Sequence, residues 1–261
     1  MDTLAVAQQK GGVGKTTTVV NLTDAAVSEG RRVLVIDLDP QGNATTTLCA
    51  SPPSPDALSV ADVLAGDASL SEVAVPGDWT DDSGGLVAVV PAVATTLHPA
   101  TRYLEDQDDR AHALGALRSA VEALADSWDL VLIDCPPALG MLTLNALVAA
   151  DGVLVVSEPS LYSLDGLADI RETIETVRAH HAPSLELRGV LLNKWRGETR
   201  TGRRWRLEFE QLMGPDLLDP PIPLRVAIAD AAETGQRLSQ SPATRELAYS
   251  YVRHLRAVTR H

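Results

Sequence analysis

The sequence predicts an α/β fold in which a single doubly wound, mostly parallel sheet carries helices on both faces. Apolar runs typical of buried strands alternate with helical patterns along the chain, and no internal repeat is present. With 261 residues, 45% of them hydrophobic, the chain is long enough to bury one large core. We therefore expect one domain over residues 1–261, with residues 50–85, rich in Pro, Ser, Gly and Asp, forming a surface excursion. In this fold class, the ligand site lies at the C-terminal ends of the strands.

The individual elements follow from the spacing of apolar residues. Strands are predicted where apolar residues follow one another as in buried parallel strands, over residues 4–7, 32–37, 86–91, 130–134, 152–156 and 187–193. Helices are predicted over residues 19–27, 58–64, 110–126, 141–148, 161–180 and 243–259.

A glycine-rich loop joins the first strand to the first helix and reads Lys10-Gly11-Gly12-Val13-Gly14-Lys15-Thr16-Thr17. Strand, glycine-rich turn and helix form the context that a phosphate-binding loop requires. The glycines permit backbone conformations closed to other residues, so that the loop N–H groups can surround an anion at the positive end of the helix. Lys15 would then reach the β- and γ-phosphates, and the Thr16 hydroxyl would bind Mg²⁺.

The loop also carries an unusual second lysine. Gln9 occupies the position of the first glycine in the usual phosphate-loop pattern, and Lys10 precedes the glycines. The chain has 19 Arg but only three Lys, namely Lys10, Lys15 and Lys194, so two of the three lysines lie in this loop. A compact ammonium suits close approach to phosphate oxygens, and the alternative for Lys10 is an ordinary solvated loop lysine.

Two predicted strands end in carboxylates. The strand over residues 32–37 runs into Asp37-Leu38-Asp39-Pro40-Gln41-Gly42-Asn43, and the strand over residues 130–134 ends at Asp134 before Cys135-Pro136-Pro137. Carboxylates at strand ends beside a phosphate loop are well placed for water or Mg²⁺. An Asx-turn or a helix cap is the alternative for each of them taken alone.

In order along the chain, the glycine loop, D-x-D-P-Q-G-N and I-D-C-P-P resemble the ParA/MinD family of deviant Walker A ATPases, with the short, Soj-like ParA proteins the most similar group. The resemblance covers nearly the whole chain and implies a P-loop NTPase fold, ATP and Mg²⁺ as cofactors, and an ATP-sandwich homodimer in which Lys10 reaches the partner's nucleotide. It implies that Lys15 is catalytic, that Asp39 orients the attacking water, that Asp37 supports the Mg²⁺ shell and that Asp134 holds Mg²⁺ with Thr16. It places the following residues at the nucleotide: Gly11, Gly12, Val13, Gly14, Lys15, Thr16, Thr17, Asn193 (against the adenine) and Pro223. It leaves Lys194 open, between support of the base site and a surface role.

Charge is strongly polarised along the chain, whose formal net charge is −13. Residues 1–187 hold 9 basic and 27 acidic side chains, whereas residues 188–261 hold 13 and 8. If residues 195–206 are helical, Arg196, Arg200, Arg203 and Arg204 share one face, flanked by two tryptophans. This pattern favours a phosphate-binding surface within residues 195–261, without a motif for reading base sequence; a solvated helix face is the alternative.

The resemblance implies ATP-dependent, non-specific binding of double-stranded DNA. The arginine of the ParA I-P-R-N motif corresponds to Leu224 in Ile222-Pro223-Leu224-Arg225, so Arg225 is a DNA-contact candidate shifted by one residue. We expect a cytoplasmic, nucleoid-associated partitioning ATPase with weak intrinsic hydrolysis that a ParB-like partner stimulates.

Two other functions remain open. A cargo-positioning ATPase would use the same switch with a partner other than a centromere complex. A MinD-like membrane-surface ATPase is disfavoured, because residues 257–261 lack the bulky apolar residues of an amphipathic anchor, and we expect no membrane partner. Cys49 and Cys135 form no metal or redox spacing, which fits a reducing compartment.

Overall fold

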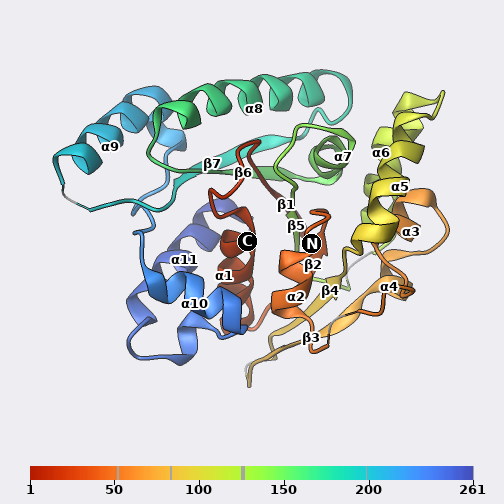
Figure 1. Ribbon diagram of the computed structural model, residues 1–261, viewed down its shortest axis with the longest axis horizontal. Helices are drawn as coiled ribbons and strands as arrows, with labels where there is room; N and C mark the ends of the chain where they lie inside the picture. Colours follow the sequence, from red (N-terminus) through yellow and green to blue (C-terminus); the bar gives the residue numbers. More distant parts are fainter. Residues whose placement is uncertain (52, 83, 125–126, 198, 261) are drawn as a thin grey trace.

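A central sheet of seven strands organises the part of the chain that the computed structural model describes, residues 1–51, 53–82, 84–124, 127–197 and 199–260 (Figure 1). The strands are β1 (Asp2–Ala7), β2 (Arg32–Asp37), β3 (Val75–Thr80), β4 (Leu86–Val90), β5 (Leu130–Asp134), β6 (Gly152–Ser157) and β7 (Glu186–Leu192). Their order is β3-β4-β2-β5-β1-β6-β7, and all neighbouring pairs are parallel except β3 with β4. The predicted doubly wound, mostly parallel sheet is confirmed.

The helices cover both faces of this sheet. They are α1 (Lys15–Ser28), α2 (Asn43–Leu48), α3 (Val60–Ala65), α4 (Leu70–Val73), α5 (Ala94–Glu105), α6 (Arg110–Glu122), α7 (Met141–Ala149), α8 (Leu161–His180), α9 (Arg200–Met213), α10 (Val226–Thr234) and α11 (Arg245–Val258), with short 3-10 turns at Gly214–Asp216 and Leu238–Gln240. Residues 125 and 126, at the end of the helix predicted over 110–126, lie outside the described residues.

The inner strands β1, β2, β4, β5 and β6 are mostly apolar because each face of the sheet packs against its own helical layer. In β1, Ala5 packs into a core shared with α3 and α5 to α9, whereas Leu4 and Val6 pack into a second core shared with α1, α2, α10 and α11. The same alternation continues in β2, where Leu34 and Ile36 face the first core. Figure 1 shows α8 and α9 on one side of the sheet and α1, α10 and α11 on the other.

The segment predicted as a surface excursion, residues 50–85, differs in part from that expectation. It contains α3, α4 and the edge strand β3, which pairs antiparallel with β4. Pro76 and Gly77 interrupt its apolar pattern, and proline is tolerated in a sheet mainly at an edge, which is where β3 lies.

The sheet order brings the C-terminal ends of β2, β5, β1 and β6 side by side, at the edge of the sheet formed by the strand ends. Asp37 at the end of β2 and Asp134 at the end of β5 are direct partners in the register of this parallel pair. The end of β1 pairs with Asp134 on one side and with β6 on the other, so the glycine-rich loop leaves the sheet between these strands. Local sequence and sheet topology together therefore assemble a site at this edge.

Candidate nucleotide-binding site

The glycine-rich loop adopts a conformation that only glycine accommodates easily at two positions. Gly12 has φ of 75° and Gly14 has φ of 98°, both in the left-handed region. The side-chain amide of Asn193 donates to the Val13 carbonyl at 2.8 Å. A Cβ on Gly14 would lie 2.2 Å from that amide nitrogen. Gly14 is therefore required both by the turn and by the close approach of Asn193.

Helix α1 begins directly in this loop, at Lys15. Lys15 is buried, with 6% exposure, and its ammonium donates to the Lys10 carbonyl at 3.3 Å. Burial lowers the pKa of Lys15, and the nearby Asp134 acts in the opposite direction. The other predicted loop residues lie around it: Gly11 and Gly12 exposed, Val13 buried, and Gly14, Thr16 and Thr17 half-buried.

Asp134 is a fully buried carboxylate; within the described part of the chain no hydrogen bond of full geometry reaches either of its oxygens, and the groups that compensate it are the nearby Thr16 hydroxyl and Lys15 ammonium. Burial raises its pKa well above the ordinary value and the neighbouring Asp37 adds to this, whereas Thr16 and Lys15 act to lower it. A buried charge without partners is costly unless a cation or hydrogen bonds compensate it. An oxygen-preferring cation such as Mg²⁺ fits this position, with Thr16 beside it.

Asp37 differs from Asp134 because the protein itself satisfies both of its oxygens. Oδ1 accepts from the Asp39 N–H at 3.0 Å, and Oδ2 accepts from the N–H and hydroxyl of Thr45 at 2.8 and 2.7 Å. Burial nevertheless raises the pKa of Asp37 to about 6. Asp39, 8% exposed, accepts from the Gln41 N–H through Oδ1 at 3.0 Å. Asp37 thus orders the turn that presents Asp39 next to Asp134.

Lys10 points away from its own loop. Its ammonium is hydrogen-bonded to the Glu158 carboxylate after β6 and to the Ser160 hydroxyl at 3.1 Å, with 31% of the side chain exposed. Lys10 is therefore an ion-paired residue at the rim of the site and not a freely solvated loop lysine. Glu158 could not be predicted from the sequence, since this contact joins residues 148 positions apart in the chain.

The end of β7 closes the site on its other side. Asn193 donates its backbone N–H to the Ser157 carbonyl at 2.7 Å, and the ammonium of Lys194 donates to the Gly12 carbonyl. The role of Lys194 was open from the sequence, and the structure shows it in contact with the loop. The scarcity of lysine was the only sequence signal for this contact.

Pro223 lies beside the segment that follows Asn193. Trp195 and Pro223 form a parallel bridge, in which the Trp195 N–H donates to the Ile222 carbonyl and the Leu224 N–H donates to the Trp195 carbonyl, both at 2.9 Å. The segments that carry Asn193 and Pro223, both predicted to lie at the nucleotide, are therefore adjacent.

The predicted arginine face is wrong in one respect, because Arg196 does not lie on the helix. Gly197 has φ of 71°, which is incompatible with a right-handed helix at this position, and α9 begins only at Arg200. Arg204 pairs with Glu208 at 2.7 Å and lies 5.8 Å from the Trp205 ring. Glu198 lies outside the described residues. The candidate DNA-contact residues Arg196, Arg200, Arg203, Arg204 and Arg225 are all exposed.

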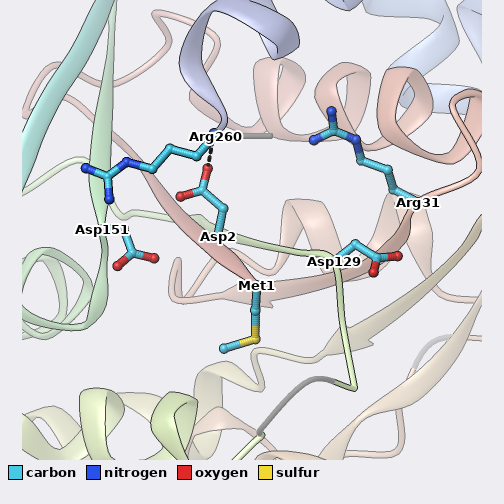
Figure 2. Close-up of a pocket in the computed structure, with 6 residues that line it drawn as sticks. All are labelled: Met1, Asp2, Arg31, Asp129, Asp151 and Arg260. Carbon is cyan, nitrogen blue, oxygen red and sulfur yellow. Dashed lines mark hydrogen bonds between the residues drawn. The ribbon is translucent and has the colours of Figure 1, made fainter.

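A charged hollow of about 510 Å³ lies at the other end of β1, away from the loop (Figure 2). It is lined by Met1, Asp2, Arg31, Asp129, Asp151 and Arg260. Each of its three carboxylates accepts a backbone hydrogen bond, from Arg260 to Asp2 at 2.9 Å (dashed in Figure 2), from Arg32 to Asp129 at 2.8 Å and from Thr3 to Asp151 at 2.9 Å. The protein backbone therefore satisfies the carboxylates at this end of the sheet.

The fold and site define a P-loop protein, with a glycine-rich loop, a buried lysine and strand-end carboxylates around one edge of a parallel sheet. A family model described as an AAA domain matches residues 1–187. The chromosome-partitioning ATPase Soj of Thermus thermophilus is 38% identical over 252 residues, covering 96% of this chain and 92% of its own. The chromosome partitioning protein ParA of Caulobacter vibrioides is 37% identical over 235 residues, covering 89% and 84%. The chain belongs to the ParA/MinD family of P-loop ATPases, together with these Soj and ParA proteins, and the resemblance seen in the sequence is confirmed.

Solved structures agree with the fold. A Mycobacterium smegmatis protein described as cobyrinic acid a,c-diamide synthase, with bound ADP and magnesium, has a TM-score of 0.78 at 35% identity and covers 98% of this chain and 96% of its own. McdA of Cyanothece, in its apo form, has a TM-score of 0.86 at 22% identity, covering 99% and 100%, which supports the fold alone.

Proposed function

We propose that this chain is an ATP-dependent DNA-partitioning ATPase. Mg-ATP would drive two copies into a sandwich dimer that binds double-stranded DNA without sequence preference, and hydrolysis, stimulated by a ParB-like partner, would release it. The observation that carries the proposal is Lys10, whose ammonium lies outside its own loop in a chain whose relatives are named partitioning ATPases. Such a protein would act in the cytoplasm, on the nucleoid.

In this proposal, the loop N–H groups and Lys15 bind the phosphates, and burial of Lys15 strengthens its interaction with them. Asp39 orients the attacking water, for which its Oδ2 is available, since within the described ranges only Oδ1 accepts a hydrogen bond. Thr16 and Asp134 would hold Mg²⁺, and Asp37 would keep the adjoining turn in place. When bound, Mg²⁺ neutralises charge that develops on the phosphates.

Lys10 is suited to act on the nucleotide of a second copy. In the single chain, the Glu158 carboxylate holds its ammonium at the rim of the site, 31% exposed, where another molecule can reach it. Exchange of Glu158 for a γ-phosphate would keep the ammonium paired in both states. An arginine finger supplied in trans accelerates phosphoryl transfer by roughly 10³–10⁵, and we expect a smaller effect of the same kind from lysine.

The test is the oligomeric state with ATP, ADP or a non-hydrolysable analogue, measured by light scattering after size-exclusion chromatography. Wild type is expected to dimerise with ATP or the analogue, and Lys10→Ala to remain monomeric. Glu158→Gln is the matched control, because it breaks the same ion pair but keeps the ammonium, and it should still dimerise. Dimerisation of Lys10→Ala at the wild-type ATP concentration would exclude the role of this lysine.

The name of the M. smegmatis protein raises a second activity, amide synthesis. If the amide nitrogen came from glutamine, its release would need a reactive thiolate. In the described part of the chain, Cys49 and Cys135 are both buried, and burial raises the pKa of the Cys49 thiol to about 11 and that of Cys135 further. Neither thiol is suited to this task, so the partitioning activity is the better proposal.

For a MinD-like role at a membrane, the structure offers one relevant finding. Among the described helices, none combines the length and apolar character needed to cross a membrane.

A further inference from the structure

All three lysines of this arginine-rich chain meet at one loop. Lys10 and Lys15 belong to the loop, and Lys194, 179 residues further along than Lys15, donates its ammonium to the Gly12 carbonyl. The ammonium of Lys15 donates to the Lys10 carbonyl, so two of the lysines bind loop carbonyls directly. A chain that uses Arg at 19 other positions has placed Lys where it contacts the phosphate-binding backbone.

The backbone at Lys194 is strained. Its φ is 54°, and it is the only non-glycine residue with positive φ in the part of the chain that the structure describes. For a residue other than Gly, Asn or Asp, this conformation costs about 1 kcal/mol or more, and such outliers persist where the surroundings require them. Here the preceding residue, Asn193, is fixed by hydrogen bonds to the Ser157 and Val13 carbonyls, and the turn directs Lys194 back to the loop.

Asn193 and Lys194 together hold two consecutive loop carbonyls, those of Val13 and Gly12. In a trans peptide, the C=O and the N–H of the same unit point in opposite directions. Holding the Gly12 carbonyl outward therefore fixes the Val13 N–H toward the other side, and holding the Val13 carbonyl fixes the Gly14 N–H. These N–H groups are among those that a phosphate-binding loop presents to its anion.

We propose that Lys194 is a positioning residue for the bound nucleotide, which orients the Gly12–Val13 peptide of the phosphate loop and adds a positive charge next to it. It acts through the loop and does not itself contact the reacting atoms. Its effect falls on binding of the diphosphate portion shared by ATP and ADP, and much less on the chemical step. This inference rests on the proposed nucleotide-binding function and adds a residue to it.

The test is Lys194→Asn, because Asn tolerates the left-handed conformation and carries no charge. We expect the affinity for Mg-ADP, measured by calorimetry, to fall about tenfold, since a hydrogen bond from a charged donor contributes at least this factor. The KM for ATP should rise by a similar factor, with kcat at saturating ATP within about twofold of wild type. Lys194→Arg restores a charged donor but not the compact ammonium, so it should recover only part of the affinity and bind more tightly than Lys194→Asn.

Two controls separate positioning from stability. Lys194→Gly relieves the backbone strain, so its melting temperature should equal or exceed that of wild type while its Mg-ADP affinity falls as in Lys194→Asn. Arg102→Asn removes one positive charge from the exposed surface of α5 and should leave Mg-ADP binding unchanged. Wild-type Mg-ADP affinity in Lys194→Asn would overturn the inference alone. Absence of Mg-ADP and Mg-ATP binding in the wild-type protein would overturn both the inference and the proposed function.

Discussion

Asp134→Asn is expected to stabilise the nucleotide-free protein while abolishing hydrolysis. The wild-type carboxylate is fully buried, accepts no hydrogen bond of full geometry among the described residues, and has Asp37 as its direct neighbour in the sheet. Its pKa is raised, first by burial and then by Asp37, so the charged form is disfavoured in the folded state. Asparagine has nearly the same shape and removes the charge.

The magnitude follows from the cost of an uncompensated buried group. A buried polar atom left without a partner costs about 1–3 kcal/mol, and more when it is charged, although Lys15 offsets part of the cost here. Removing the charge should therefore raise the free energy of unfolding by about 1–3 kcal/mol. At about 2 °C per kcal/mol for a chain of this size, the melting temperature should rise by about 2–6 °C.

The measurement is thermal unfolding at pH 8 with a chelator, followed by the same scan with saturating Mg-ATP. A ligand at 100 times its Kd stabilises wild type by about 2.7 kcal/mol, and Asp134→Asn should lose most of this gain. Asp24→Asn is the matched control, because Asp24 is equally buried but pairs with Arg237 at 2.7 Å and accepts two hydrogen bonds from Ser239. Breaking such a buried pair should destabilise the protein by about 3–5 kcal/mol. If Asp134→Asn also melts below wild type in the chelator, Asp134 is not the uncompensated charge that we describe.

Three further predictions concern hydrolysis, DNA binding and pH. Asp39→Ala should accumulate as an ATP-bound dimer on size-exclusion chromatography, and a variant that stays monomeric with ATP would refute the water-orienting role. Arg203→Glu combined with Arg204→Glu should abolish ATP-dependent gel shifts of DNA, with ATP binding intact. The same reversal at the exposed Arg102 and Arg110 should not, and wild-type affinity should fall steeply with salt. Burial lowers the pKa of His254 to about 4, so at this residue only the unfolded chain gains a proton as pH falls below about 6.5, and the His254 contribution to stability should drop by roughly 2 kcal/mol between pH 7.5 and 5. Asp37 and Asp134, whose pKa values are raised, act in the opposite direction over this range, so the quantity to measure by denaturant titration is the stability difference between wild type and His254→Gln. That difference should shift by about 2 kcal/mol between the two pH values, and an unchanged difference would refute the assignment to His254.

The sequence predicts the parts of the site that local patterns encode. An apolar run predicts a buried strand. The glycines or the carboxylate that follow it predict a phosphate-binding loop or a metal-binding side chain at the C-terminal end of that strand. Because parallel strands place their C-terminal ends at one edge, the loop, Asp37 and Asp134 had to lie near one another, and the register pairs the two aspartates directly. The difference between the predicted and the observed arginine helix also has a local cause: Gly197, with its positive φ, separates Arg196 from α9.

Contacts between distant segments could not be predicted in this way. Lys10 meets Glu158 across 148 positions, and Lys194 meets Gly12 across 182. Neither of these contacts leaves a periodicity or a spacing in the sequence, because each depends on how the strand ends are arranged in three dimensions. Composition alone hinted at them, through the scarcity of lysine.

The features at this edge of the sheet share a physical property, which is that each costs stability in the isolated chain. Asp134 is a buried carboxyl group with a raised pKa and no full hydrogen bond among the described residues, Lys194 is in a strained conformation, and Lys15 is buried with a lowered pKa. Elsewhere, the buried pair of Asp24 and Arg237 shows that the same fold can satisfy its buried charges. Where local rules are broken together at one place, function is the usual reason. A bound magnesium nucleotide, carrying both positive and negative charge, would compensate Asp134 and Lys15 at once, so its binding should stabilise this chain more than removal of either charge alone.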